Sequence, residues 1–383
     1  MIKINAAVDQ IELSGIRQFD EWVSKIDGVS KLTLGEPNFV TPQHIMDATK
    51  RALDQGQTHY EASAGNPELR RATAEYYNEK FELNYRASNV LVTVGATEAI
   101  ATALKTITAP GDYVLIPVPC YPVYLPLMAL QGVKPIFMDT RATNFRVTAA
   151  LIEETLGQNK DKSIVGFIFN YPTNPTGISY DCAELSAIKD ILKMNGIWVM
   201  SDEIYCELTY DQPHISMASL YPEGTILIMG LSKSHAMTGW RIGFVLAEER
   251  LITAMKKVHQ YHVTTAATLS QVAALEAVTN GKQDSVSMRD IYQTRRDRLV
   301  TLLKKIGYNL IKPDGTFYLF VQVPEKLKVT SVEFCRKLAI QEKVAVIPGS
   351  AFTEFGEGYF RVSFAASDEQ LEKVVIALKN IEH

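Results

Sequence analysis

Five polar side chains in this chain each follow a short apolar run of the kind that forms a buried strand. Tyr121, Asn174 and Asp202 follow three such runs, Tyr205 comes three positions after Asp202, and Lys233 follows a further run. The carboxyl ends of parallel strands meet at one edge of a sheet, so we expect these side chains to face one ligand site. Each residue alone has an ordinary structural explanation, such as a turn, a helix cap or a solvated lysine. The prediction therefore rests on their combination.

A second feature is a turn that suits an anion. Gly95, Ala96 and Thr97 follow another apolar run and open a helical pattern. The first turn of a helix has unpaired N–H groups and the positive end of the helix dipole, which together favour a phosphate. Arg241, eight positions after Lys233, can return toward the same anion if the residues between them form a turn. The sequence therefore predicts a phosphate site close to the lysine.

One cofactor uses all of these groups. Pyridoxal 5′-phosphate has an aldehyde that a lysine captures as a Schiff base, and a ring nitrogen that a carboxylate keeps protonated. An amide and a phenol can donate to its phenolate oxygen, and an aromatic side chain can stack on its ring. The seven histidines show no metal-ligand spacing, and no GxGxxG or P-loop segment is present. We therefore predict pyridoxal 5′-phosphate as the cofactor and no metal.

The elements that position these residues form an alternating pattern. Strand-length apolar runs alternate with amphipathic helical stretches, which indicates a mainly parallel sheet with helices on both faces. Residues 241–247 follow the previous run too closely for a crossover helix, so we expect this strand to be antiparallel to its neighbour. The other runs are residues 90–94, 113–118, 164–169, 197–200 and 226–229, and helical stretches include 97–107, 182–194, 249–263 and 268–280.

The character of the chain changes near residue 285. We predict an α/β fold whose large domain, residues 41–285, holds the mainly parallel mixed sheet between helices. Residues 1–40 and 286–383 are expected to form a smaller α+β domain. In the large domain, Thr41 and Asn66 are predicted N-caps because a proline follows each of them. The later strands are expected at 316–323, 344–347 and 359–364, and the later helices at 284–306, 331–342 and 368–381.

Composition excludes several classes of protein. The 383 residues are 46% hydrophobic and carry a net charge of −4, which argues against binding nucleic acid or anionic membranes through bulk charge. Residues 113–133 carry no charge but contain four prolines, so they are interpreted as buried strand, turn and helix rather than a membrane span. The four cysteines have no CxxC spacing, and no signal peptide is visible. We expect a cytoplasmic protein.

Three segments also resemble those of class I aminotransferases, which are fold type I pyridoxal-phosphate enzymes. They read NPTG at 174–177, SDEIY at 201–205 and SKSHAMTGWRIG at 232–243, and the resemblance runs from LGEPNF at 34–39 to YFRVSFA at 359–365. It implies that Lys233 forms the Schiff base and that Asp202 pairs with the ring nitrogen. The implied donors to the phenolate oxygen are Tyr205 and Asn174, the stacking residue is Tyr121, and the phosphate ligands are Ala96, Thr97, Ser232 and Arg241.

The resemblance has implications for subunits and substrates as well. Tyr60 matches a tyrosine that reaches the phosphate of the neighbouring subunit, which implies a homodimer with shared active sites. Arg361 matches the arginine that binds the α-carboxylate of the substrate as a bidentate fork, helped by Asn174 and the Gly35 backbone. The segment around Ile16 is similar to the mobile edge that closes over the substrate. The implied substrates are an amino acid and a 2-oxo acid.

The choice of amino acid stays open between two readings. The chain is similar to bacterial aromatic amino-acid aminotransferases and to N-acetyl-diaminopimelate aminotransferases, and the apolar Ile16 and Phe39 favour the aromatic ring. Thr97 stands where some dicarboxylate-preferring relatives carry a lysine, and no replacement cation is obvious, although 2-oxoglutarate stays a candidate acceptor. A carbon–sulfur β-lyase on the same scaffold is a further alternative. A regulator is disfavoured because no extra DNA-binding module precedes the fold.

Overall fold

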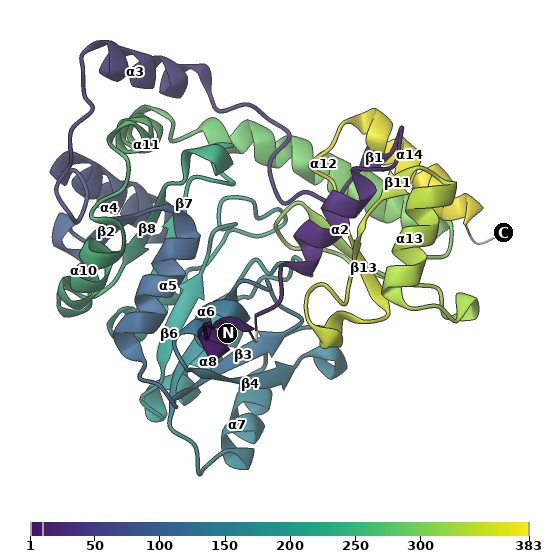
Figure 1. Ribbon diagram of the computed structural model, residues 1–383, viewed down its shortest axis with the longest axis horizontal. Helices are drawn as coiled ribbons and strands as arrows, with labels where there is room; N and C mark the ends of the chain where they lie inside the picture. The colour runs from purple at the N-terminus through teal and green to yellow at the C-terminus, as the bar shows by residue number, and fades with distance from the viewer. Residues whose placement is uncertain (1, 10, 382–383) are drawn as a thin grey trace.

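The computed structural model describes residues 2–9 and 11–381. Its main sheet has seven strands in the order β2-β8-β7-β6-β5-β3-β4 (Figure 1). All neighbours pair in parallel except β8, which is antiparallel to both β2 and β7. The strands are β2 (Val90–Thr93), β3 (Tyr113–Val118), β4 (Lys134–Asp139), β5 (Ile164–Asn170), β6 (Trp198–Asp202), β7 (Thr225–Gly230) and β8 (Gly243–Leu246).

Helices enclose this sheet. Every residue of β2, β7 and β8 is buried, which requires cover on both faces of the sheet. The predicted mainly parallel mixed sheet between helices is therefore confirmed. The helices of this part are α3 (Gln43–Asp54), α4 (Pro67–Phe81), α5 (Gly95–Ile107), α6 (Tyr124–Leu130), α7 (Ala149–Gln158), α8 (Cys182–Met194), α9 (Met217–Leu220), α10 (Glu249–Val263) and α11 (Thr268–Asn280).

One predicted helix start is wrong. Thr41 was expected to cap the first helix of the large domain, but α3 begins at Gln43 and Pro42 occupies the capping position. The Thr41 hydroxyl instead donates a 2.8 Å hydrogen bond to the carbonyl of Ala236, a contact 195 residues away that local sequence does not reveal. The prediction for Asn66 is confirmed, because its side chain accepts from two amides of the first turn of α4.

The C-terminal part contains a second sheet of four antiparallel strands, in the order β12-β13-β10-β9. In Figure 1 this part lies to the right of the main sheet. Its elements are α12 (Asp284–Lys305), β9 (Leu310–Ile311), β10 (Tyr318–Gln322), α13 (Ser331–Gln341), β11 (Val344–Ala345), β12 (Ile347–Pro348), β13 (Tyr359–Ser363) and α14 (Asp368–Asn380).

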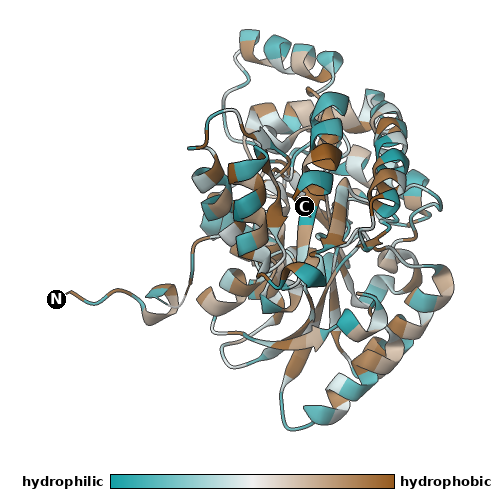
Figure 2. Ribbon diagram, turned by 90° about the vertical axis from the view of Figure 1, so that its right-hand side faces the viewer, coloured by the Kyte–Doolittle hydropathy of each residue, from teal (hydrophilic) through white to brown (hydrophobic). Residues whose placement is uncertain are grey.

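The N-terminal segment joins this C-terminal part. Its strand β1 (Ser30–Lys31) pairs in parallel with β11, and α2 (Gly15–Val23) contacts β12. Before α2, the chain extends away from the body of the molecule and includes the short helix α1 (Ala6–Asp9) (Figure 2). Among the described residues, no helix has the length and apolar character needed to cross a membrane. The predicted small domain also includes residues 1, 10, 382 and 383, which lie outside the described residues.

Candidate active site

A cavity of about 670 Å³ opens beyond the carboxyl ends of β5, β6 and β7. Its walls come from both sheets and from α2, so residues from the two ends of the chain meet in it. Most of the residues predicted to form the site line this cavity. They are Ile16, Gly35, Ala96, Thr97, Tyr121, Asn174, Asp202, Tyr205, Ser232, Lys233, Arg241 and Arg361.

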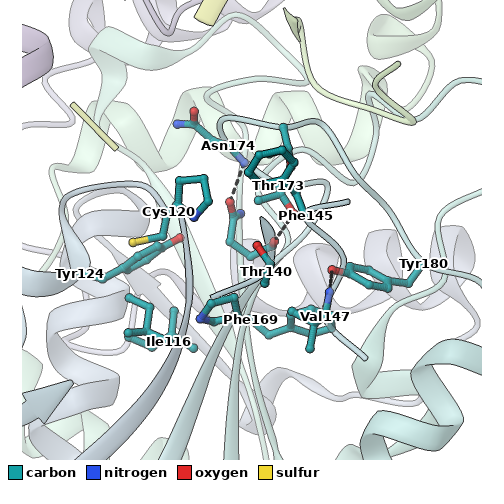
Figure 3. A pocket seen from close by; sticks show the side chains of 15 residues that line it. Ile116, Cys120, Tyr124, Thr140, Phe145, Val147, Phe169, Thr173, Asn174 and Tyr180 are labelled. Carbon is teal, nitrogen blue, oxygen red and sulfur yellow. Dashed lines mark hydrogen bonds between the residues drawn. The ribbon is translucent and has the colours of Figure 1, made fainter. Parts of the chain in front are cut away.

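A second, much smaller cavity lies behind Asn174. Figure 3 shows Tyr124 and Cys120 on one side of it and Tyr180 on the other. Its volume of about 20 Å³ is enough for a single water molecule and far too small for a cofactor. Of these two cavities, the larger one has the room for a cofactor together with an amino acid.

Lys233 lines the larger cavity, and its ammonium has an unusually low pKa. Its ammonium donates a hydrogen bond to the carbonyl of Gly35 in the N-terminal segment. Burial, together with the positive charges of Arg361 and Arg241, lowers the pKa of Lys233 to about 8. An amine with such a pKa is neutral much more often than a surface lysine near pH 7, so it can attack a carbonyl or accept a proton.

Asp202 ends β6 and is only 4% exposed. Burial raises the pKa of its carboxyl to about 6, although a 2.6 Å hydrogen bond from the Tyr124 hydroxyl to Oδ2 opposes this rise. The Asn170 side chain donates to the Asp202 carbonyl at 2.9 Å and fixes the end of the strand. Tyr124 was not predicted from the sequence; its place at the start of a helix just after Tyr121 was the available signal.

Arg361 on β13 is 1% exposed and is held by two hydrogen bonds. Its Nη1 donates to Oδ1 of Asn174 at 3.0 Å, and its Nη2 donates to the carbonyl of Thr33 at 2.7 Å. The guanidinium also lies 4.0 Å from the ring centre of Tyr318, which was not predicted. No carboxylate among the described residues forms an ion pair with Arg361. Its charge is therefore available to an anionic ligand.

The start of α5 brings Gly95, Gly243 and Arg241 close together. Gly95 has a φ of +74°, and a Cβ added there would lie 2.7 Å from Nη2 of Arg241. A Cβ on Gly243 would lie 2.6 Å from the backbone of Gly95. Both glycines therefore let Arg241 and strand β8 approach the first turn of α5, where free amides and an arginine together suit a phosphate.

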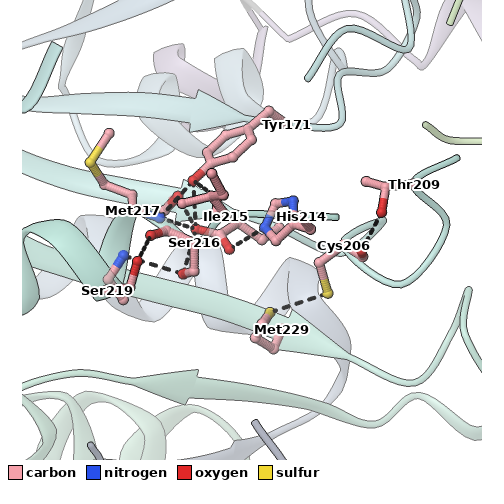
Figure 4. A network of polar contacts seen from close by, with 12 residues as sticks. Tyr171, Cys206, Thr209, His214, Ile215, Ser216, Met217, Ser219 and Met229 are labelled. Atoms are coloured by element: carbon pink, nitrogen blue, oxygen red, sulfur yellow. Dashed lines mark hydrogen bonds and ion pairs between the residues drawn. The ribbon is translucent and has the colours of Figure 1, made fainter. Parts of the chain in front are cut away.

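A buried polar network supports the end of β6 from behind. Glu203 accepts hydrogen bonds from Ser201, Tyr171 and the amide of Met217, and its other oxygen lies 2.7 Å from Nε2 of His214. Figure 4 shows Tyr171, His214 and Met217 converging on this point. Because its carboxylate is fully engaged inside the protein, Glu203 anchors the backbone directly after Asp202 rather than facing the cavity.

The remaining predicted residues have distinct placements. The hydroxyls of Tyr205 and Tyr318 are 3.0 Å apart, and the ring of Tyr121 meets that of Tyr124 edge to face at 5.8 Å. Tyr60 is 88% exposed and does not line the cavity of its own chain. Its assignment to a neighbouring subunit stays a prediction.

The model of the family described as aminotransferase class I and II matches residues 27–378. The chain belongs to this family. As an aminotransferase, it is a transaminase, and enzymes of this family generally use pyridoxal phosphate. The predicted fold type I architecture is confirmed by solved aminotransferases that superpose over the whole chain.

Three similar proteins illustrate the range of this family. A probable N-acetyl-LL-diaminopimelate aminotransferase of Bacillus subtilis is 45% identical over 97% of this chain and 93% of its own. Aromatic-amino-acid aminotransferase 2 of Thermococcus litoralis is 35% identical over 98% of both chains. The structure of aspartate aminotransferase from Thermus thermophilus with maleate superposes with a TM-score of 0.93 at 30% identity, covering 100% of both chains. These relatives act on different amino acids, so family membership alone leaves the substrate open.

Proposed function

We propose that this aminotransferase binds pyridoxal 5′-phosphate in the large cavity and transfers an amino group from an L-amino acid, preferably an aromatic one, to a 2-oxo acid such as 2-oxoglutarate. The observation that carries the proposal is the convergence of Lys233, Asp202 and Arg361 on one cavity. These three provide an amine of lowered pKa, a buried carboxylate, and a guanidinium that has no carboxylate partner among the described residues, which are the groups that the reaction requires.

The donors present fit the cofactor. Free amides and Arg241 at the start of α5 suit its phosphate, and Gly95 and Gly243 leave room for a close approach. A buried carboxylate that is readily ionised suits a protonated ring nitrogen. The residues that would hold the phosphate are Gly95, Ala96, Thr97, Ser232 and Arg241. Asp202 would pair with the ring nitrogen, and Asn174 and Tyr205 would donate to the phenolate oxygen. Tyr121 would stack on the ring, and Lys233 would bind the aldehyde.

When bound, pyridoxal phosphate supplies an aldehyde that condenses with amines and a ring that accepts the electron pair released at Cα of the substrate. Lys233 would act as the proton carrier, because its neutral Nζ can accept the proton from Cα of the donor amino acid. In the second half of the reaction, its ammonium form would donate a proton to Cα of the amino acid that is formed from the 2-oxo acid. Asp202 stabilises positive charge at the ring nitrogen from a buried position, where a carboxylate exerts a strong field. Tyr205 donates from its hydroxyl toward the phenolate oxygen.

Arg361 orients the amino acid for this proton transfer. Its guanidinium would bind the α-carboxylate as a fork, and its hydrogen bonds to Asn174 and Thr33 hold the fork in one orientation before substrate arrives. Ile16 on α2 lines the same cavity as Arg361. Closure of this helix over the cavity would exclude water from Cα of the substrate.

The preference for aromatic donors rests on the apolar Ile16 in the cavity wall and on the similarity to the Thermococcus litoralis enzyme. The similarity to the Bacillus subtilis protein favours N-acetyl-LL-diaminopimelate as the alternative donor. The Thermus thermophilus neighbour was solved with maleate, a dicarboxylic acid, which supports 2-oxoglutarate as the acceptor.

The proposal extends to the assembly and its location. We propose a cytoplasmic homodimer in which Tyr60 completes the phosphate site of the partner subunit, and the exposed position of Tyr60 supports this role. We also propose that residues 41–285 form the large domain and that residues 1–40 with 286–383 form the small one. The pairing of β1 with β11 supports the assignment of the N-terminal segment to the small domain.

A panel of donors tests the function. The protein loaded with pyridoxal phosphate is assayed with 2-oxoglutarate and tyrosine, phenylalanine, aspartate or N-acetyl-LL-diaminopimelate, and glutamate formation is measured. We expect the highest kcat/KM for the aromatic donors. A higher value for N-acetyl-LL-diaminopimelate would establish the alternative. Pyruvate and ammonia released from cystathionine without an oxo acid would show a β-lyase instead, and no transfer from any donor would overturn the proposal.

A further inference from the structure

Thr33 forms hydrogen bonds on two sides, and one of them belongs to the proposed α-carboxylate site. The residue lies two positions after β1 and is fully buried. Its carbonyl accepts a 2.7 Å hydrogen bond from Nη2 of Arg361. Its hydroxyl donates to Oδ1 of Asp20 on α2. Thr33 therefore connects the guanidinium of the C-terminal strand β13 to the N-terminal helix.

Both oxygens of the Asp20 carboxylate have partners. Oδ1 accepts from Thr33, and Oδ2 accepts from the ammonium of Lys31 at 3.4 Å. Lys31 also donates to the hydroxyl of Ser24, one helical turn after Asp20. Asp20 lines the cavity, where a negative charge repels an anionic substrate. Its charge is therefore unfavourable for substrate binding by itself, whereas its hydrogen bonds hold it in one orientation.

The guanidinium of Arg361 is held in place but keeps a free donor. Nη1 donates to Asn174 at 3.0 Å and Nη2 donates to Thr33, while the buried Nε has no partner among the described residues. Two fixed acceptors limit the rotation of the guanidinium, so the direction in which it meets a ligand depends on them. A displaced carbonyl at Thr33 would turn the guanidinium away from that direction.

The backbone before Thr33 is tied to the second sheet. The amide of Leu32 donates to the carbonyl of Ala345 at 2.8 Å, and the amide of Ser363 donates to the carbonyl of Leu32 at 3.0 Å. These bonds fix one side of Thr33 from β11 and β13. In the part of the chain that the structure describes, the hydrogen bond to Asp20 is the one that reaches the Thr33 side chain from α2.

We propose that Asp20 is a positioning residue that acts through Thr33 to orient Arg361 for the α-carboxylate of every substrate. The inference rests on the proposed function, in which Arg361 binds that carboxylate. The three residues form a chain of hydrogen bonds from α2 to β13, and such chains gain strength from the low polarity of a buried site. The proposal gives a function to a carboxylate whose charge alone would oppose binding.

The sign of one binding change tests the proposal. The holoenzyme is titrated calorimetrically with 3-phenylpropanoate, which has a carboxylate and a ring but no amino or oxo group and therefore does not react. If Asp20 acted only through its charge, Asp20→Ala would tighten binding. A positioning role predicts instead that Kd rises about 3- to 10-fold, as expected for the loss of one hydrogen bond.

Glu21→Ala is the matched control for the charge. Glu21 is the neighbouring carboxylate on α2 and also lines the cavity, but it forms no hydrogen bond or ion pair with any described residue. Its removal should leave the Kd of 3-phenylpropanoate unchanged or lower it.

Variants of Thr33 test the middle of the chain without changing any charge. Thr33→Val keeps the shape and the carbonyl but removes the hydroxyl, so it should raise the same Kd by a similar factor, and Thr33→Ser should restore it. The double variant with Asp20→Ala should bind no more weakly than either single variant, because both changes break one connection. The affinity for pyridoxal phosphate and the thermal unfolding midpoint should stay close to the wild type in Thr33→Val.

Four results would overturn the role of Asp20. They are tighter or unchanged binding of 3-phenylpropanoate to Asp20→Ala, additive effects in the double variant, no recovery in Thr33→Ser, and a wild-type holoenzyme that does not bind 3-phenylpropanoate. An equal loss of affinity for pyridoxal phosphate would also overturn it, because it would show general loosening. Absence of amino transfer by the wild type would refute the proposed function, whereas the titration involves no reaction and still tests Asp20.

Discussion

The hydroxyl of Tyr124 donates a 2.6 Å hydrogen bond to Oδ2 of Asp202, and both side chains are buried. Tyr124 begins α6 and Asp202 ends β6, so the contact joins a helix to the strand end that carries the carboxylate. A hydrogen bond to an ionised acceptor is strong in a poorly solvated site, and it favours the charged form of that acceptor. Tyr124 therefore positions Asp202 and helps to keep it ionised.

Removing this hydroxyl should change the pH dependence of the enzyme. Without the donor, the pKa of Asp202, already raised to about 6, should rise by about one to two units, since a hydrogen bond to a charged group contributes about 1.5–3 kcal/mol. Asp202 would then be protonated at higher pH, and the acidic limb of the kcat profile of Tyr124→Phe should move upward. Tyr77→Phe is the matched control, because the Tyr77 hydroxyl is also buried but has no hydrogen-bond partner among the residues that the structure describes. Identical profiles for both variants and the wild type would contradict the role of Tyr124.

Lys233→Ala tests the proposed proton carrier. Borohydride reduction should trap the cofactor covalently on the wild-type chain but not on this variant, and peptide mass spectrometry should locate the adduct at Lys233. Turnover should disappear, because no other amine lines the cavity among the described residues. Lys256→Ala removes an exposed lysine of α10 and should leave both signals intact. An active Lys233→Ala enzyme would remove this lysine from the mechanism.

Arg361→Lys tests the α-carboxylate site while keeping the positive charge. A lysine cannot form the bidentate fork, so KM should rise about 10- to 100-fold for every amino acid alike. Steady-state kinetics with tyrosine, aspartate and alanine measures this, with Arg298→Lys on the exposed face of α12 as the control. An effect limited to one class of side chain would place Arg361 at the side-chain end of the pocket. Thermal unfolding shows whether the variant is folded.

His44 should make the stability depend on pH. Its ring nitrogens lie 2.8 Å from Glu276 and 2.8 Å from Asp284, and these carboxylates raise the pKa of His44 even though burial alone would lower it. A raised folded-state pKa gives a stabilisation that is complete below the unfolded pKa of about 6.5 and is lost as the pH rises through the folded-state pKa.

The variant His44→Gln should therefore unfold more easily than the wild type at pH 5.5, by about 0.5 kcal/mol because the ring is partly exposed, and the difference should shrink at pH 9. Thermal or urea unfolding at the two pH values measures it. His262→Gln, at an exposed position of α10, should show no such dependence. A difference that grows with pH would have the wrong sign for this mechanism.

The main sheet could be predicted because most of its strands are continuous apolar runs. Residues 113–118 match β3 completely, and the antiparallel β8 was predicted from the short connection before it. The strand β4 was missed because it forms the edge of the sheet, where Lys134 and Phe137 are exposed and Pro135 is tolerated. Such a strand lacks the apolar run that marks a central one. The prediction that Thr41 caps a helix was wrong because its hydrogen-bond partner, the carbonyl of Ala236, is distant in sequence and leaves no local signal.

The residues of the candidate site also fall into two groups, those that could be identified from the sequence and those that could not. Asp202 and Lys233 could be identified because they follow strands, and the general rule for parallel sheets places such residues at one edge. Tyr318 could not, because it reaches the cavity from β10 of the second sheet, through packing against Arg361 that its own segment does not reveal. The spacing of apolar residues predicts one helix or strand at a time. It does not predict which side chain of that element contacts a residue of another element.

The residues proposed to handle the cofactor and those proposed to select the substrate lie in different parts of the chain. Residues that would handle the cofactor come from the middle of the chain, whereas Ile16 sits on a short helix near its beginning. This helix is attached through β1 and β11 rather than through the main sheet. In the proposed function, changes in these early residues would therefore alter which amino acid is accepted, while the residues that handle the cofactor stay the same. A chimaera that exchanges residues 11–29 between relatives would transplant specificity as one module.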